Sequence, residues 1–190
     1  MHLKMELIYP DEIAPLVPGA RGRNEMLPVV EPGGRVIARA PRAWCHAGTK
    51  LLHPVVHLQI IDRYSRIYLQ RRSASKHRYP LHWDTAIAGH VSYGETLTES
   101  LYREASEELG FTDFYPIPIT EYVREAPDQR ELVVVWAAVG HFALRPDGHE
   151  VVDGRWWEIP EIEAAYGTDT LTPTFESEFK NLKDSLLALL

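Results

Sequence analysis

Short apolar stretches separated by turn residues run through the first half of the chain and predict β-strands. Residues 27–30 and 35–38 are two such stretches joined by a Pro-Gly-Gly turn, a pattern typical of a β-hairpin. Residues 55–61 and 67–70 form a second pair of apolar stretches on either side of a polar turn. The pattern therefore predicts two strand pairs, each closed by a turn.

Two later stretches extend the predicted set of strands. Residues 132–139 are rich in valine and apolar on both faces, which indicates a buried central strand. Residues 155–158 are expected to form a last short strand. Because the start of the chain contains several prolines and a glycine, we interpret residues 1–25 as a loosely structured lead-in and residues 26–190 as a single domain.

A helical period appears near the end of the chain. Thr172 followed by Pro173 is typical of a helix start. Apolar residues then recur at helical spacing, at Phe175, Phe179, Leu182, Leu186 and Leu190. A short helix is also expected around residues 159–166. Because many strands accompany few helices in no regular alternation, the sequence indicates an α+β fold with a mixed β-sheet.

A further helix is predicted over residues 97–109, and its two ends are marked by the sequence. Thr96 and Glu99 have the spacing of a capping box, and Gly110 is a natural C-terminal stop. On a helical wheel the apolar residues of this segment fall on one stripe, made by Leu97, Leu101, Ala105 and Leu109. That stripe is expected to face the core.

Three carboxylates of this helix lie on or beside the same stripe. Glu108 falls inside it, Glu104 lies on its flank, and Glu107 comes next, all within an arc of about 100°. A solvated acidic face would explain Glu99 and its i,i+4 partner Arg103, but not a glutamate on the core side. Clustered carboxylate oxygens are the ligands that Mg²⁺ and Mn²⁺ prefer, so the helix predicts a divalent-cation site.

Composition and charge exclude several classes to which this protein could belong. Apolar residues make up 45% of the 190 residues and charged residues 25%, as in a soluble globular domain. The longest apolar run, eight residues, is too short to span a membrane, and the start of the chain lacks the apolar segment of a secretion signal. Cys45 is the only cysteine, so we expect a reducing, cytoplasmic location. The formal net charge of −7 argues against a nucleic-acid-coating role.

One set of residues resembles the signature of the Nudix hydrolase superfamily. Gly89, five intervening residues, Glu95, seven intervening residues and then the run 103–111 (Arg-Glu-Ala-Ser-Glu-Glu-Leu-Gly-Phe) match all seven fixed positions of that signature. The one departure is Ala105, which is small for a position that the signature fills with a bulky apolar residue. This departure concerns how the helix packs and not its chemistry.

The resemblance implies a fold and an activity. The fold is a Nudix-type α/β/α sandwich with a mixed β-sheet, to which this chain adds an N-terminal β-hairpin. The activity is hydrolysis of a diphosphate linked to another moiety, dependent on Mg²⁺ or Mn²⁺. The implied metal ligands are Glu104, Glu107, Glu108 and the carbonyl oxygen of Gly89. Glu95 would pair with Arg103 and brace the helix.

The resemblance leaves the general base open. In some members of the superfamily the base is the glutamate at the position of Glu104, and in others it is a later carboxylate. Two later residues are candidates in this chain, Glu131 at the start of the Val-rich strand and Glu150 in a loop. Of these two we favour Glu131 as the catalytic carboxylate.

A wider resemblance, over residues 27–157, points to the branch related to isopentenyl diphosphate isomerase. It rests on the runs 69–76 and 88–90, together with Pro80 and the pair at 83–84. That enzyme has a second metal site built from histidines and glutamates. The branch thus implies further site residues in this chain.

The implied second site would hold Zn²⁺ or Mn²⁺ at His46, His53, His90 and Glu131. A neighbouring acidic position of that site is Gln129 here. The isomerase also needs a catalytic cysteine directly before its Gly-His pair, and this chain has Ala88 at that position. Without a thiol to protonate the substrate, isomerase activity is disfavoured.

Four basic residues fall within eight positions upstream of the carboxylate helix, at Arg71, Arg72, Lys76 and Arg78. Taken singly, each is best interpreted as a solvated loop residue. Taken together in an acidic chain, they are suited to neutralise substrate phosphates. We expect Arg72 and Lys76 to be the substrate-binding residues.

These observations predict a Nudix-type pyrophosphohydrolase whose partner is a small-molecule diphosphate, such as a nucleoside diphosphate derivative. Two alternatives stay open: an isopentenyl-diphosphate-isomerase-like enzyme, and a Nudix fold that only binds a nucleotide or metabolite as a sensor. The intact carboxylate set argues against the sensor. Neither a membrane nor a nucleic acid is expected as a partner, and a homodimer is compatible with the sequence.

Overall fold

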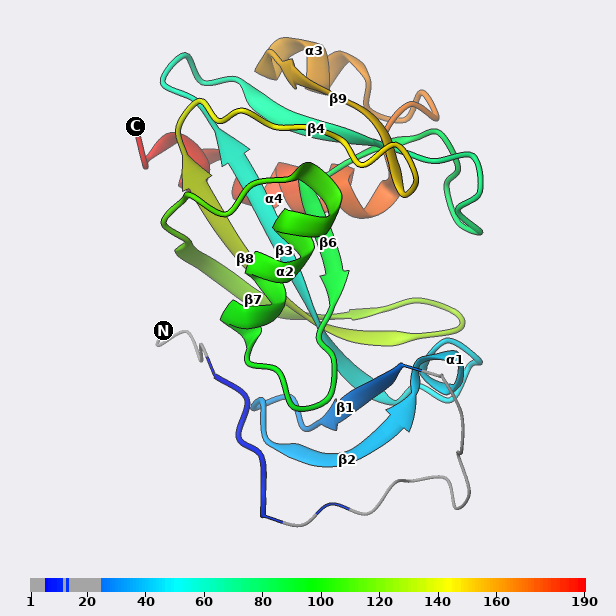
Figure 1. Ribbon diagram of the computed structural model, residues 1–190. Coiled ribbons are helices and arrows are strands. Elements are labelled where there is room, and N and C mark those ends of the chain that lie inside the picture. The colour runs from blue at the N-terminus through cyan, green and yellow to red at the C-terminus, as the bar shows by residue number, and fades with distance from the viewer. Residues whose placement is uncertain (1–5, 12, 14–24) are drawn as a thin grey trace. The chain divides into compact units, whose positions relative to one another are not determined.

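The computed structural model describes residues 6–11, 13 and 25–190. The strands are β1 (Met26–Val30), β2 (Val36–Pro41), β3 (Leu52–Ile61), β4 (Ile67–Arg72), β5 (Trp83–Asp84), β6 (Ile87–His90), β7 (Ile117–Glu125), β8 (Arg130–Val139) and β9 (Val151–Trp157) (Figure 1). The helices are α1 (Arg42–Cys45), α2 (Leu97–Leu109), α3 (Ile159–Ala164) and α4 (Pro173–Leu187). Within the described residues, no helix has both the length and the apolar character that crossing a bilayer requires.

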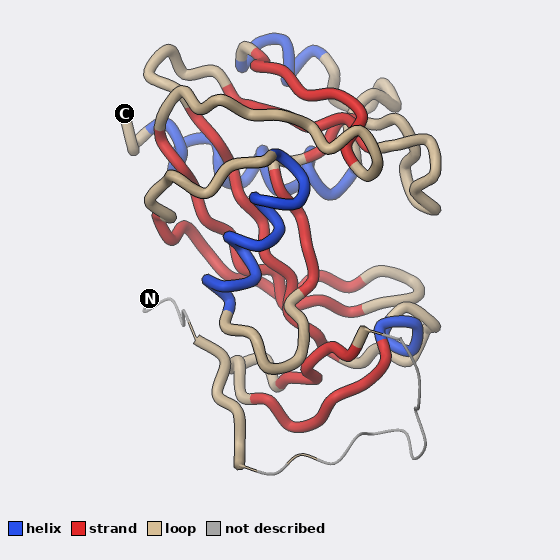
Figure 2. Tube along the Cα trace, in the orientation of Figure 1, coloured by secondary structure: helices blue, strands red, loops and turns tan. Residues whose placement is uncertain are grey.

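The strands form two sheets, which Figure 2 shows in red. β1 and β2 make a two-stranded antiparallel sheet, and the larger sheet has the order β5-β4-β3-β8-β7, with β6 paired to β3 and β9 paired to β4. The predicted α+β fold, with its mixed sheet and N-terminal hairpin, is confirmed.

Residues that are distant in the sequence assemble into two compact units. One unit contains residues 1–57, 89–101 and 120–135, and the other contains residues 58–88, 102–119 and 136–190. β3, α2, β7 and β8 each contribute residues to both units. The prediction of a single domain over residues 26–190 stays a prediction.

The strand predictions agree with the structure where the hydrophobic pattern was clear. In the first unit, the two predicted strands of the hairpin are β1 and β2, whose side chains Leu27, Val29, Ala38 and Ala40 form a small core together with Cys45 of α1. In the second unit, β3 and β4 pair antiparallel, with Ile61 opposite Ile67. The Val-rich stretch is β8, which lies between β3 and β7 in the strand order. The central position explains why β8 is apolar on both faces.

The predicted bounds of α2 are those of the structure. Thr96 and Glu99 form the reciprocal capping box: the Glu99 backbone N–H donates to Thr96 Oγ1 (3.1 Å) and the Thr96 N–H donates to Glu99 Oε2 (2.8 Å). Gly110 ends the helix with a φ of +65°, a left-handed conformation that favours glycine. The predicted apolar stripe is fully buried, from Leu97 to Leu109.

The C-terminal helix also begins as predicted. Thr172 Oγ1 accepts the Phe175 backbone N–H (3.2 Å), and Pro173 occupies the first helical position. Phe175, Phe179, Leu182 and Leu186 are buried, whereas Leu190 lies beyond the helix and is exposed. Fully burying each large apolar side chain contributes about 1.5–3 kcal/mol. The stripe is therefore core packing. The short helix α3 is likewise present, although it ends two residues before the predicted limit.

Four elements were not predicted: α1, β5, β6 and β7. α1 and β5 are too short to give a periodic signal. β7 is only partly buried and mixes charged with apolar residues. The last strand, β9, is longer than expected because it pairs with β4 along most of its length. Pairing with a partner strand is not visible in a single segment's own pattern.

The predicted lead-in is not loose where the structure describes it. Ile8 exchanges backbone hydrogen bonds with the hairpin, donating to Gly34 O (3.3 Å) and accepting from the Val36 N–H (2.9 Å). The Tyr9 hydroxyl donates to the Glu95 carbonyl oxygen (2.7 Å). Residues 1–5, 12 and 14–24, which include Pro15, Pro18 and Gly19, lie outside the described residues.

Candidate functional site

Glu108 has a buried carboxylate whose hydrogen bonds are long. It lies in α2 with a relative exposure of 6%, and it accepts only long hydrogen bonds, from Gln70 Nε2 (3.4 Å) and from the Ala88 N–H (3.5 Å). Burial raises the pKa of Glu108 well above its usual range, and the negative charge of Glu104 raises it further, against the effect of Lys76. A buried, poorly paired carboxylate is costly unless a cation compensates it.

Glu104 and Glu107 share one arginine. Arg103 Nη1 donates to Glu104 Oε1 (2.9 Å) and to Glu107 Oε2 (3.1 Å). Glu104 is mostly buried, and burial raises its pKa despite Arg103, with the charges of Glu107 and Glu150 adding to the rise. Glu107 is largely exposed. α2 carries Glu104, Glu107 and Glu108 within two turns, but among the described residues they are not a close group of potential ligand atoms, so their role as metal ligands stays a prediction.

The C-terminal end of α2 is held by the loop that precedes β9. The Arg145 N–H donates to Leu109 O (2.9 Å) and the Asp147 N–H donates to Glu108 O (3.0 Å). These bonds satisfy carbonyl groups that a helix end leaves without an intrahelical partner. The Asp147 carboxylate in turn accepts the Glu150 N–H (3.1 Å), so the turn that carries Glu150 is fixed beside the helix end.

Glu150 and Lys76 form an ion pair close to the carboxylates. The Lys76 ammonium binds the Glu150 carboxylate, and the Ser73 N–H donates to Glu150 O (2.9 Å). Glu150 raises the pKa of both Glu104 and Glu108 after the larger effect of burial, while Lys76 lowers that of Glu108. One positive and one further negative side chain therefore act directly on the carboxylate group.

The Arg72 guanidinium forms hydrogen bonds with the loop that follows β4. It donates to the Arg78 carbonyl oxygen (3.0 and 3.2 Å), to the Tyr79 carbonyl oxygen (3.2 Å) and to Asp84 Oδ2 (3.2 Å). The other oxygen of Asp84 accepts from the Thr172 hydroxyl (2.8 Å). Arg72 thereby ties the loop between β4 and β5 to β5 and to the start of α4.

Two predicted residues of the signature lie in the first unit. Glu95 accepts hydrogen bonds from the Ser100 hydroxyl (2.6 Å) and the Ser92 N–H (3.2 Å). Its pairing with Arg103, and the role of the Gly89 carbonyl as a metal ligand, stay predictions. Gln70 was missed as a site residue: its side chain is buried beside Glu108, and its Oε1 has no hydrogen-bond partner. A glutamine in a strand gives no sequence signal for this role.

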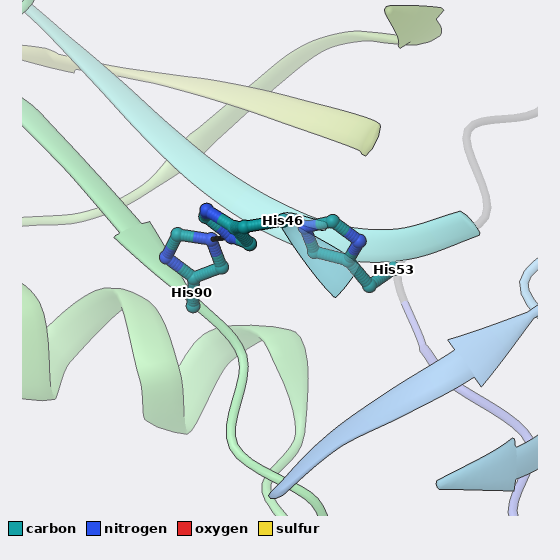
Figure 3. A group of neighbouring side chains, drawn as sticks. All are labelled: His46, His53 and His90. Atoms are coloured by element: carbon teal, nitrogen blue, oxygen red, sulfur yellow. Dashed lines mark hydrogen bonds between the residues drawn. The ribbon is translucent and has the colours of Figure 1, made fainter. Parts of the chain in front are cut away.

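The structure brings together three histidines from three separate elements of the first unit. His46 follows α1, His53 lies in β3, and His90 ends β6 (Figure 3). The potential ligand atoms of these three side chains all lie within 4.8 Å of one another. His46 Nε2 and His90 Nε2 are 2.9 Å apart, and the rings of His53 and His90 stack with centroids 5.5 Å apart.

The protonation of the histidines suits metal binding. His53 is fully buried, and its Nδ1 bonds to the Leu51 carbonyl oxygen (2.9 Å), so Nδ1 carries the proton. Its Nε2 is buried without a hydrogen-bond partner. Burial lowers the pKa of both His53 and His90, with Arg42 adding to the effect on His90. Neutral imidazoles with an unused nitrogen are the ligands that Zn²⁺ or Mn²⁺ binds.

Glu131 lies in the same unit and has its own partners. Arg124 Nε donates to Glu131 Oε2 (2.8 Å), Arg124 Nη2 binds the same oxygen, and Gln129 Nε2 donates to Glu131 Oε1 (2.7 Å). The charge of Glu131 raises the pKa of His53, against the larger effect of burial. Among the described residues, the close group of potential metal ligands contains the three histidines and not Glu131.

Comparison with known proteins identifies a family model and related sequences that match this chain. The family model described as the NUDIX domain matches residues 51–176. An isopentenyl-diphosphate Delta-isomerase of Mycolicibacterium vanbaalenii is 30% identical over 151 residues, which cover 75% of this chain and 83% of that protein. An uncharacterised Nudix hydrolase of Yersinia pestis is 33% identical over 155 residues, which cover 78% of this chain and 80% of that protein.

Solved structures show the same fold. The protein DR0079 of Deinococcus radiodurans aligns with a TM-score of 0.72 at 18% identity, covering 83% of this chain and 98% of that one. The NUDIX domain of Shewanella oneidensis NrtR, solved with ADP ribose, aligns with a TM-score of 0.59 at 16% identity, covering 70% of this chain and 87% of that one.

Proposed function

Since this chain belongs to the Nudix superfamily and is a Nudix-type pyrophosphohydrolase, we propose that it cleaves a diphosphate linkage in a nucleoside diphosphate-type or related metabolite, with Mg²⁺ or Mn²⁺ as cofactor. The observation that carries this proposal is Glu108, a buried carboxylate whose hydrogen bonds within the described residues are all long, one helical turn from the half-buried carboxylate Glu104. A divalent cation is the group that would make this arrangement stable.

Glu104, Glu107 and Glu108 would hold the metal. A bound Mg²⁺ would neutralise charge on the diphosphate and lower the pKa of a bound water. The protein's own part is to keep three carboxylates on one helical face, which the i,i+4 spacing of Glu104 and Glu108 provides. Arg103 orients Glu104 and Glu107 from the same helix.

We propose that Glu150, rather than Glu131, is the general base. Glu150 interacts electrostatically with both Glu104 and Glu108, and the Asp147 turn holds its backbone in place. Glu131 instead accepts three hydrogen bonds from Arg124 and Gln129 in the first unit. In this assignment the Glu150 carboxylate accepts a proton from the attacking water.

Lys76 and Arg72 take different parts in substrate binding. Lys76 has Glu150 as its ion-pair partner and its ammonium also acts on Glu108, which supports Lys76 as the cation that binds a substrate phosphate. Arg72 bonds to the Arg78 and Tyr79 carbonyls and to Asp84, so its main part is to position the loop that carries Lys76.

An isomerase activity is a second candidate because several relatives carry that name. The sequence disfavours it, since Ala88 stands where the isomerase has its cysteine. Cys45, the only cysteine of the chain, is buried, and burial raises the pKa of its thiol to about 11. A thiol in this state does not form the reactive thiolate at neutral pH.

We further propose that His46, His53 and His90 hold a second ion, Zn²⁺ or Mn²⁺. The support is the buried Nε2 of His53, which has no hydrogen-bond partner among the described residues, and the closeness of its ring to the ring nitrogens of His46 and His90. Metal analysis of protein purified without a histidine tag should find about one transition metal ion per chain. Finding none would end this part of the proposal.

Release of phosphate and pyrophosphate from a panel of diphosphate compounds tests the hydrolase. The panel includes nucleoside diphosphate sugars, ADP-ribose and isopentenyl diphosphate. We expect Mg²⁺-dependent turnover that Glu108→Gln abolishes. Glu163→Gln, at an exposed glutamate of α3, is the matched control and should keep wild-type activity.

Each outcome of the panel has a definite meaning. Turnover that survives Glu108→Gln would refute the metal assignment. Isomer formation from isopentenyl diphosphate without phosphate release would favour the isomerase. Binding without turnover on every compound would favour the sensor.

A further inference from the structure

Glu131 is a buried carboxylate of β8, the strand that pairs with the His53-bearing strand β3, and both of its oxygens accept hydrogen bonds. Glu131 has a side-chain exposure of 5%. Oε2 accepts from two nitrogens of Arg124, and Oε1 accepts from the Gln129 amide (2.7 Å). Its charge nevertheless acts on His53, so it is part of the electrostatic surroundings of the histidines.

The interaction between the Arg124 guanidinium and the Glu131 carboxylate is strong. A guanidinium that donates two hydrogen bonds to a carboxylate is among the stronger interactions in proteins, and burial strengthens it. Arg124 comes from β7 and Glu131 from β8, with Gln129 directly before β8. The two strands that carry these residues are neighbours in the sheet. Arg124 also cancels the charge that Glu131 would otherwise offer to a cation.

We propose that Arg124 and Gln129 withhold Glu131 from the histidine-bound ion, so that the site has three neutral protein ligands and an open position for an anionic oxygen ligand. This inference rests on the histidine site proposed above. It assigns Arg124 a positioning role: the guanidinium sets how many protein ligands the ion receives.

The charge of such a site decides what it binds. Three imidazoles leave the full double positive charge of Zn²⁺ uncompensated by the protein. An exogenous anion or hydroxide is the natural fourth ligand of this site. Zinc sites with three protein ligands and one open position are typical of catalysis and ligand binding, whereas structural sites are closed by four protein ligands.

Zinc affinity in a set of variants tests the proposal. The affinity of metal-free protein for Zn²⁺ is measured by competition with a chromophoric chelator, for the wild type, Arg124→Met, Glu131→Gln and the double variant. Arg124→Met should release Glu131 as a fourth ligand and tighten Zn²⁺ binding by about 10- to 100-fold. Glu131→Gln alone should change the affinity less than about threefold, and in the double variant it should remove the gain.

A second measurement needs no variant at Arg124, which guards against a folding defect there. The visible absorption of the Co²⁺-loaded wild type should change when azide is added, because azide enters the open position. An unchanged spectrum would overturn the proposal. A loss of Zn²⁺ affinity of more than about tenfold in Glu131→Gln would also overturn it, since Glu131 would then be a ligand.

The outcomes distinguish a failure of this inference from a failure of the proposed hydrolase function. If the wild type binds no Zn²⁺, both the histidine site and this inference fail, while Mg²⁺-dependent hydrolysis at Glu104, Glu107 and Glu108 is judged by its own assay. If Zn²⁺ binds and Glu131→Gln weakens it, only the role of Arg124 fails.

Discussion

Single side chains carry most of the chemistry of this protein, and each is defined by what surrounds it. Glu108 is exceptional because it is buried on the core side of α2 and accepts only long hydrogen bonds. His53 is exceptional because one of its ring nitrogens is buried without a partner. Both arrangements cost free energy in the folded protein, and the proposed cations would offset both costs.

The titration of Glu108 gives the first prediction at this scale. Its pKa is raised in the folded protein, so its contribution favours folding at low pH and is lost as the pH rises through the folded pKa. In EDTA, we expect Glu108→Gln to be more stable than the wild type near neutral pH, by about 1–3 kcal/mol. The difference should shrink as the pH falls below the ordinary glutamate range. Denaturant unfolding over a pH series checks this, and parallel curves for the two proteins would contradict it.

The identity of the base gives the second prediction. Glu150→Gln should lower kcat by about 10²- to 10⁴-fold, the usual contribution of a general base, because the attacking water then lacks a proton acceptor. Glu131→Gln is the control and should leave Mg²⁺-dependent turnover within a few-fold of the wild type. Steady-state kinetics on the substrate found in the panel measure both variants. A large loss in Glu131→Gln with little in Glu150→Gln would restore the assignment made from sequence.

At the scale of elements, one helix and two irregular segments build the carboxylate site. α2 supplies the proposed metal ligands, the loop between β4 and β5 supplies Lys76, and the turn before β9 supplies Glu150. Backbone hydrogen bonds join these segments: Asp147 N–H to Glu108 O, and Ser73 N–H to Glu150 O. The irregular segments are therefore positioned by regular structure, which is how loops commonly carry function.

The loop between β4 and β5 gives the third prediction. Lys76→Met should raise KM by about 10- to 100-fold and change kcat less, because a charge-assisted hydrogen bond to a phosphate contributes about 1.5–3 kcal/mol to binding. Lys180→Met, at an exposed lysine of α4, is the matched control. Steady-state kinetics with Mg²⁺ in excess separate KM from kcat. An unchanged KM would place Lys76 outside the substrate site.

At the scale of the whole molecule, the chain is acidic, with a formal net charge of −7, yet its proposed substrate is an anion. Local positive charge must therefore come from a bound cation and from a few residues such as Lys76. The carboxylate group and the histidine group belong to different compact units and share no residue. The two groups can therefore be tested by separate substitutions.

Metal-dependent stability gives the fourth prediction. An ion that binds only the folded protein stabilises it by about 2.7 kcal/mol at a concentration 100 times its Kd. Mg²⁺ should raise the Tm of the wild type and of His53→Gln but not that of Glu108→Gln, and Zn²⁺ should show the reverse selectivity. Thermal unfolding of metal-free protein with each ion added back checks this. If one variant abolished the response to both ions, two separate sites would be ruled out.

The sequence by itself determined what depends on local periodicity. The bounds of α2, its capping box and the placing of Glu104 and Glu108 on one face follow from 3.6 residues per turn, which acts within one segment. The buried strand β8 and the start of α4 follow in the same way. The resemblance to the Nudix signature added the expected roles of these residues, because the signature depends on spacing within one segment.

Tertiary structure alone decided what depends on segments distant in the chain. Residue spacing contains no distances between elements, so it could not show that Gln70 lies beside Glu108 or that Lys76 binds Glu150. The resemblance proposed the three histidines as a group, and the fold brings their ring nitrogens together. The hydrogen bonds that Arg124 and Gln129 donate to Glu131 also depend on the fold. Such bonds form between groups that packing brings together, whatever their separation in the sequence.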